Sequence, residues 1–226
     1  MAWIDRQVPE GDEIFYDHIG YFVPNLETAG AQLEKLGFQV SAINIQYNEN
    51  EAGELIPTGT SNRLVKLNRG FIEVLAATGE SALADQLLAM LARYQGLHVI
   101  ALTHPDMTRT ATRLSDARID MQDAVNLRRK VMVDSTETLM EFTVARVKPG
   151  TFPEGRLQIL TCHTPENFWL PGDMDHANRA DTLTDLLICV EDVAEATARY
   201  KRFFGKASEK MGGLGTLDLA RGRFHF

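Results

Sequence analysis

Hydrophobic and polar residues follow one pattern three times along the chain. In each case an apolar, strand-like run leads to an Asn or Asp, and an amphipathic helix begins at the next residue. The runs cover residues 18–23, 99–103 and 185–190, and the predicted helix N-caps are Asn25, Asp106 and Asp192. The apolar face of the first helix is predicted to be Leu26, Ala29, Leu33 and Leu36, and the other two helices repeat that spacing. The caps are 81 and then 86 residues apart, so the pattern predicts an internal repeat.

Strand patterns follow each predicted helix. In the first repeat they cover residues 37–47, 61–67 and 71–77, with a polar loop at 48–60. In the second they form a hairpin with arms at 127–133 and 139–147, followed by a strand at 156–162. The third repeat has room only for its strand, its helix and a hairpin of residues 216–220 and 223–226.

Two segments separate the repeats. Residues 81–94 are predicted to form a linking amphipathic helix, and the Pro-, Gly- and Asp-rich stretch 166–181 is predicted to be a linker. We therefore expect an α+β fold of repeated βαβββ modules. The expected division is a first module with the linking helix, a second module, and a linker with a partial third module, at residues 1–93, 94–170 and 171–226.

Composition narrows the classes of partner. The 226 residues carry a formal charge of -8, which argues against nucleic acid or an anionic membrane as the main partner. No run of eighteen apolar residues occurs, so no membrane span is expected. Cys162 and Cys189 both lie in apolar, strand-like runs and are expected to be buried free thiols, which favours the reducing cytoplasm.

Four segments carry a resemblance to a known family. The segment DHIGYFVPNLETAGAQLEKLGF resembles the opening of a vicinal-oxygen-chelate module, and GTSNRLVKLNRGFIEVLA resembles its close. The segments LTCHTPENFW and HANRA are similar to parts of the glyoxalase-like subgroup that join two module pairs. The resemblance implies that two modules pair into a curved, cup-shaped mixed sheet with helices outside. It also implies a divalent metal in the cup, held by residues of the first and last strands.

His18 and Glu73 take the metal-ligand positions that the resemblance implies. An imidazole and a carboxylate with open water positions suit Fe, Mn, Ni or Zn acting as a Lewis acid, and Glu73 is also the candidate catalytic base. Both residues are polar among the apolar neighbours of their own strand face, where a charge needs a partner. The alternative is that His18 caps its strand and that Glu73 pairs with an arginine such as Arg63.

The second module departs from the pattern. When the helix starts are aligned, Val99 stands where the first module has His18, and Gln158 stands where it has Glu73. Valine cannot bind a metal and glutamine binds one weakly through its carbonyl oxygen, so Gln158 is an auxiliary ligand or a substrate contact. The third module has Asp185 at the His18 position.

Other polar residues complete the candidate set. His163, just beyond the last strand of the second module, is a candidate ligand, acid/base group or substrate contact at the cup mouth. Asn62 is a candidate for a hydrogen bond to the substrate, and the alternative is that it only forms a turn. His98 reaches the cup only if a bulge turns it inward. His104 and His225 are expected to have structural roles, and His176 is expected to be a turn residue, although the resemblance of its segment leaves a role in the site open.

Two functions of different kinds remain open. The first is a glyoxalase-like, metal-dependent lyase, isomerase or dioxygenase acting on a small substrate with vicinal oxygens. The second is a metal-free cup that binds or sequesters a small molecule, favoured by Val99 and Gln158 and by an apolar lining of Phe22, Phe71 and Leu157. The unpaired third module is expected either to pair with a second chain, giving a homodimer, or to pack against the first two modules.

Overall fold

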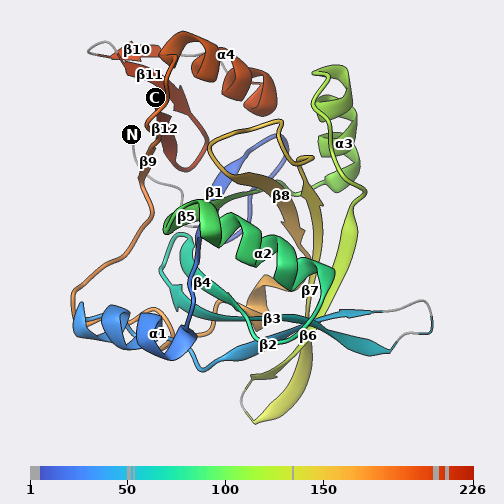
Figure 1. The fold of residues 1–226 in the computed structure, drawn as a ribbon, viewed down its shortest axis with the longest axis vertical. Helices are drawn as coiled ribbons and strands as arrows, with labels where there is room; N and C mark the ends of the chain where they lie inside the picture. The colour runs from blue at the N-terminus through green and yellow to red at the C-terminus, as the bar shows by residue number, and fades with distance from the viewer. Residues whose placement is uncertain (1–5, 50–51, 53, 134, 206–208, 212–213) are drawn as a thin grey trace.

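The element order β-α-β-β-β occurs three times in the computed structural model, which describes residues 6–49, 52, 54–133, 135–205, 209–211 and 214–226 (Figure 1). The first set is β1 (Phe15–Phe22), α1 (Leu26–Lys35), β2 (Asn44–Glu49), β3 (Leu55–Lys66) and β4 (Phe71–Ala77). After α2 (Ala82–Arg93), the second set is β5 (Gly96–Thr103), α3 (Met107–Asp116), β6 (Val125–Val133), β7 (Thr136–Arg146) and β8 (Arg156–Cys162). After the short 3-10 helix η1 (Pro165–Asn167), the third set is β9 (Asp185–Leu187), α4 (Val193–Phe204), β10 (Glu209–Met211), β11 (Leu214–Asp218) and β12 (Arg223–His225).

The first two sets share one eight-stranded sheet. Its strand order is β2-β3-β4-β1-β5-β8-β7-β6, with β1 and β5 antiparallel at the centre. Each central strand also pairs in parallel with the last strand of its own set, β1 with β4 and β5 with β8. The edge strands β2 and β6 approach one another, so the sheet is strongly curved and nearly closed. The curved, cup-shaped sheet with helices outside is therefore confirmed.

Helix boundaries follow the predicted caps. The side chains of Asn25, Asp106 and Asp192 each accept a hydrogen bond from the backbone N–H three residues on, at 2.8, 3.0 and 3.0 Å. These bonds satisfy one of the donors that every helix start leaves unpaired. Helix α4 ends at Gly205, whose left-handed backbone, with φ at 65°, favours glycine.

The largest core lies on the outer face of the sheet. Ile19 of β1, Ile100 of β5 and Leu157 of β8 point outward from the sheet and pack with α3, α4 and the third module. Because strand side chains alternate, His18 and Gln158 point the other way, into the cup. The expected apolar lining is therefore wrong for Leu157, which neighbours Gln158 and faces this outer core. Phe22 is buried in a separate cluster with Leu75, Leu87 of α2 and Val99.

Several strand limits differ from those expected. Strand β1 begins at Phe15, earlier than residue 18, because Phe15 and Tyr16 still pair with Thr103 and Leu102 of β5. Strand β3 begins at Leu55, inside the predicted polar loop, of which residues 50, 51 and 53 lie outside the described residues. This stretch pairs through its backbone while Ile56 stays 48% exposed, so no buried face marks it in the sequence.

The third module has one strand more than expected and forms its own sheet, β10-β11-β12-β9. Strand β10 is too short to leave a periodic pattern, which is why the sequence did not reveal it. The module packs against the first two within one chain, as one of the two expected arrangements requires. The backbone N–H of Tyr16 in β1 donates to the carbonyl of Arg221 at 2.7 Å, and Arg221 is fully buried.

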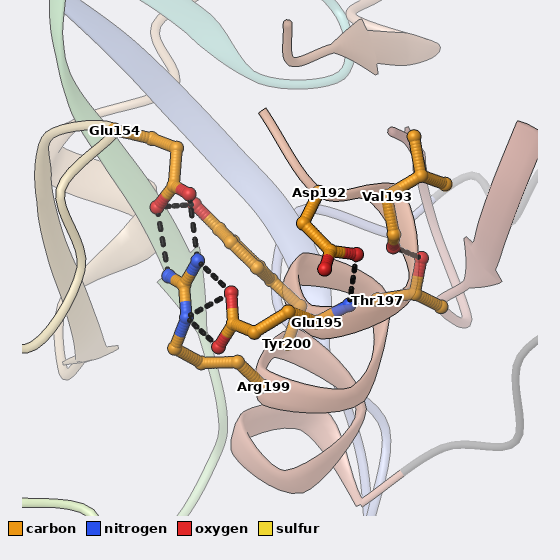
Figure 2. A network of polar contacts seen from close by, with 7 residues as sticks. All are labelled: Glu154, Asp192, Val193, Glu195, Thr197, Arg199 and Tyr200. Carbon is orange, nitrogen blue, oxygen red and sulfur yellow. Dashed lines mark hydrogen bonds and ion pairs between the residues drawn. The ribbon is translucent and has the colours of Figure 1, made fainter. Parts of the chain in front are cut away.

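A buried ion pair fixes α4 to the loop between β7 and β8 (Figure 2). Arg199 of α4 donates two hydrogen bonds to Glu154, at 2.8 and 2.7 Å, and others to Glu195 one turn earlier. The side chains of Arg199 and Glu154 are only 10% and 9% exposed. The carboxylates of Glu154 and Glu195 both raise the pKa of Arg199, so this arginine stays protonated.

No helix in the described part of the chain combines the length and the apolar character that a bilayer crossing requires.

Both cysteines are free, as expected, but only Cys162 is shielded, and Cys189 is exposed instead of buried. Burial, with the negative charge of Asp17 adding to it, raises the pKa of the Cys162 thiol to about 12.

We predict that Arg199→Ala destabilises the protein by about 3–5 kcal/mol, because Glu154 would keep a buried charge without a partner. The measurement is urea unfolding followed by circular dichroism. The matched control is Arg202→Ala, which removes an exposed arginine from the same helix and should cost less than about 0.5 kcal/mol. Equal effects of the two variants would show that the Glu154 pair does not anchor α4.

We also predict that iodoacetamide at pH 8 modifies Cys189 well before Cys162, because the thiolate is the reactive form and Cys162 stays protonated there. Peptide mass spectrometry over a time course measures both sites. Modification of Cys162 at the same rate would contradict the buried position of its thiol.

Candidate functional site

The interior of the curved sheet holds a cavity of about 100 Å³. Inward-facing side chains of the eight-stranded sheet and the segment after η1 line it. Its polar lining residues include Asp17, His18, Gln46, Asn62, Glu73, Arg129, Arg146, Arg156 and Gln158. An apolar side is formed by Phe71, Phe142, Phe168 and Trp169, among others.

A β-bulge in β1 places Asp17 and His18 together in the cavity. The β1–β5 pairing runs from Tyr16–Leu102 directly to His18–Ala101, so Asp17 is the extra residue. His18 Nδ1 lies 2.6 Å from Asp17 Oδ2, and both side chains are buried. A carboxylate only accepts hydrogen bonds, so the proton of the neutral ring belongs on Nδ1. The lone pair of Nε2 then faces the cavity. The Phe71 ring stacks on the His18 ring, with 4.2 Å between the two ring centroids.

Glu73 faces His18 with one of its two oxygens. Its Oε1 accepts a hydrogen bond from Asn62 Nδ2 at 2.5 Å and a longer one from Gln46 Nε2 at 3.5 Å. Its Oε2 lies 3.7 Å from His18 Nε2. Arg63 is not the partner of Glu73, since it bonds to Glu34 and to the carbonyl of Ser41. His18 lies inside β1 and does not cap it.

Gln158 is the third residue whose side chain approaches the place in the cavity that His18 and Glu73 face. Its Nε2 lies 3.4 Å from His18 Nε2, and its Oε1 is buried without a hydrogen-bond partner. Because an amide's nitrogen and oxygen are assigned from their surroundings, a half-turn of this group would direct the oxygen to the same point. His18 Nε2, Glu73 Oε2 and the Gln158 oxygen are one nitrogen and two oxygens, and these donors suit a divalent transition metal. Among the described residues, no cluster of three or more His, Cys, Asp or Glu is suited to hold a metal. A third protein ligand beside His18 and Glu73 would therefore have to be an amide oxygen, such as that of Gln158.

The other candidate histidines lie elsewhere. His163 is exposed and bonds to Thr143 at 2.8 Å, outside the cavity lining. A bulge does occur at His98, but its ring stacks between Phe22 and Tyr94 and does not line the cavity. His176 is buried in the linker, where it joins Gln39 N–H and the Lys66 carbonyl, at 2.9 and 2.7 Å. The remaining two bond to nearby groups: His104 to the Asp106 backbone and His225 to Asp185.

Three cavity arginines were missed by reading the sequence. Arg129, Arg146 and Arg156 come from β6, β7 and β8, which form one side of the cup. Arg156 is two residues before Gln158, so alternation already predicts that the two share a face. Arg146 pairs directly with Gln158 in the β7–β8 register, which only the structure provides.

Burial controls the electrostatics of these arginines. It lowers the pKa of the Arg129 and Arg146 guanidiniums and brings the pKa of Arg156 to about 10. The positive charge of Arg146 adds to the lowering at Arg156, while Glu73 acts in the opposite direction at all three. All three are protonated at neutral pH, so the cavity wall is positively charged.

Comparison with known proteins finds one matching family model and several similar structures. The model of the glyoxalase-like domain family matches residues 16–204. A hypothetical protein from Staphylococcus aureus is similar in structure, with a TM-score of 0.71 and 12% identity over 94% of this chain and 85% of that chain. A Streptomyces coelicolor methylmalonyl-CoA epimerase in complex with 2-nitronate-propionyl-CoA gives a TM-score of 0.48, at 18% identity over 67% of this chain and 99% of that chain. The Mycobacterium tuberculosis methylmalonyl-CoA epimerase gives 0.45, at 17% identity over 65% of this chain and 87% of that chain.

No curated protein sequence matches the chain. At these identities the solved structures bear on the fold alone. The domain match, in contrast, extends from β1 to the end of α4 and includes both central strands of the cup. The chain therefore belongs to the glyoxalase-like domain family.

Proposed function

We propose that the protein is a divalent-metal-dependent enzyme that acts on a small substrate with two neighbouring oxygens. The observation that carries this proposal is the convergence of His18 Nε2, Glu73 Oε2 and the unpartnered amide of Gln158 inside one cavity. In the proposal these three residues hold the metal. When bound, the metal would supply Lewis-acid polarisation of the substrate oxygens.

Neighbouring residues prepare these groups for that role. Asp17 fixes the ring orientation and the tautomer of His18, as carboxylates commonly do for metal-binding histidines. Asn62 and Gln46 both donate to Glu73 Oε1, which leaves Oε2 as the free oxygen. Thr60 in turn donates to Gln46 Oε1 at 2.7 Å and so orients that amide. Asn62 therefore acts first as a positioning residue in this proposal, while its buried Oδ1 remains available for a substrate.

The donor set favours proton transfer over oxygen activation. Non-haem iron oxygenases use two histidines and one carboxylate, whereas His18 is the one histidine among the described residues that line the cavity. Glu73 would act as the base once its Oε2 leaves the metal, taking a proton from a substrate carbon and returning it to another substrate atom. We therefore propose lyase or isomerase chemistry, with Glu73 as the base. His163 has no part in it because its ring lies outside the cavity.

A metal-free binding cup is the second candidate. The observation that favours it is the apolar side of the cavity, where Phe168 and Trp169 pack on Phe71 at 5.0 and 6.0 Å. Such a surface would hold a small ligand without reacting with it.

A homodimer also remains a prediction, and light scattering during size-exclusion chromatography tests it.

We predict that the protein binds close to one Mn(II), Ni(II), Zn(II) or Fe(II) per chain after loading. The paired substitution His18→Ala/Glu73→Ala should abolish this binding, because it removes the nitrogen and the carboxylate. Elemental mass spectrometry after removal of free metal gives the stoichiometry. The control is His163→Ala, which removes an imidazole outside the cavity and should bind as the parent does. A parent that stays metal-free under every loading would leave the binding cup as the better account.

We further predict that Asp17→Asn weakens metal binding by about 10–100-fold while the metal stoichiometry at saturation is kept. The amide no longer stabilises the Nδ1 proton as a carboxylate does, so the ring loses its fixed tautomer. Competition against a fluorescent chelator measures the affinity, and thermal unfolding of the metal-free variant shows whether the fold is intact. An unchanged affinity would mean that His18 is not a ligand through Nε2.

A further inference from the structure

We infer that the substrate carries an anionic group, a carboxylate or a phosphate, and that Arg129, Arg146 and Arg156 bind it. The inference rests on the proposed function for the reacting end of the substrate. It adds the chemical class of the group at the other end.

The three arginines occupy one wall of the cavity next to the proposed metal ligands. Arg146 lies opposite Gln158 in the β7–β8 pairing, and Arg156 precedes Gln158 by two residues on the same face. Arg129 comes from the neighbouring strand β6 and lines the same cavity. A molecule that reaches both Gln158 and this wall therefore spans the reacting groups and the positive charges.

No carboxylate of the described residues forms an ion pair with these guanidiniums, although the negative charge of Glu73 acts on all three. In the described part of the chain none of the three forms an ion pair or a hydrogen bond, and the Nε atom of each is buried without a partner. Arg156 has only a cation–π contact with Phe22, at 5.4 Å. Of the two carboxylates in the cavity lining, Asp17 is bonded to His18 and Glu73 to Asn62. Buried charges are normally paired, so the missing partner points to a ligand.

Further positive charges lie next to these arginines, around a second cavity. Arg146 and Arg156 also line a second cavity, of about 320 Å³, whose other charged lining residues are Arg93 and Lys148. Among the described residues, no Asp or Glu lines it. The chain as a whole carries a charge of -8, so this concentration of cations runs against its overall balance. A guanidinium's planar fork of donors matches the oxygens of a carboxylate or a phosphate.

Anion binding to the metal-free protein tests the inference. Protein treated with EDTA is titrated calorimetrically with phosphoglycolate, with malonate and with uncharged ethylene glycol, at low salt. We expect saturable binding of at least one anion, none of the neutral diol, and a rise in melting temperature with anion concentration. Preference between the two anions identifies the phosphate or the carboxylate as the natural group. No saturable binding of either anion would overturn the inference.

Variants show whether the three arginines are the site. Arg146→Gln and Arg156→Gln should each weaken anion binding by about tenfold or more. In anion-free buffer neither should lower the melting temperature, because each removes an unpaired buried charge and its repulsion. The matched control is Arg128→Gln, which removes the exposed neighbour of Arg129 on the same strand. Undiminished binding in the cavity variants, or an equal loss in the control, would contradict the assignment.

The two proposals fail separately. Metal content of the Arg146→Gln variant should match that of the parent, since no proposed ligand is altered. If the parent binds no metal but the anion binds and depends on Arg146, the metal enzyme is wrong and the anion site stands. If metal binds and the anion does not, the reverse holds.

Discussion

The bulge at Asp17 in the central strand β1 is the constraint on which the rest of the site depends. A regular strand would place Asp17 and His18 on opposite faces, one in the cup and one in the outer core. The extra residue brings both into the cavity and still leaves Tyr16 in the outer core, 1% exposed. The same strand therefore supplies the imidazole, the carboxylate that orients it and an anchor for the third module. Its parallel neighbour β4 then places Glu73 two residues beyond Phe71, the partner of His18.

Hydrogen bonding divides the polar groups of the cavity into two kinds. Glu73 Oε1, Gln46 and Asp17 have their partners inside the protein, and these contacts fix their positions. Gln158 Oε1, Asn62 Oδ1 and the three arginine Nε atoms are buried without partners. Groups of the second kind are costly in a folded protein unless something else binds them. This division separates the supporting residues from those that face a ligand.

Much of the fold was predictable because it depends on local patterns. The caps at Asn25, Asp106 and Asp192 and the spacing of their helices are properties of short segments, and all three caps form as expected. The resemblance also led to His18, Glu73 and Gln158, which the structure brings together.

Residues set by pairing register or irregularity were not predictable. Asp17 enters the cavity through a bulge, and Arg146 enters through its register with Gln158, neither of which leaves a periodic signal. His98 shows the opposite case, since a bulge occurs there but stacking on Phe22 and Tyr94 holds the ring elsewhere. His163 follows β8 in sequence, yet the chain turns it outward to Thr143. Phe168 and Trp169 reach the cavity only because the linker folds back over it.

The burial of Arg221 has a consequence for the electrostatics of the cavity. Its guanidinium packs on Phe15 at 4.2 Å, and burial lowers its pKa to about 10, opposed by the charge of Asp17. Asp17 thus interacts electrostatically with a cation of the third module and directly with the imidazole that faces the cavity. The third module therefore contributes to the electrostatic environment of the cavity as well as to the outer core.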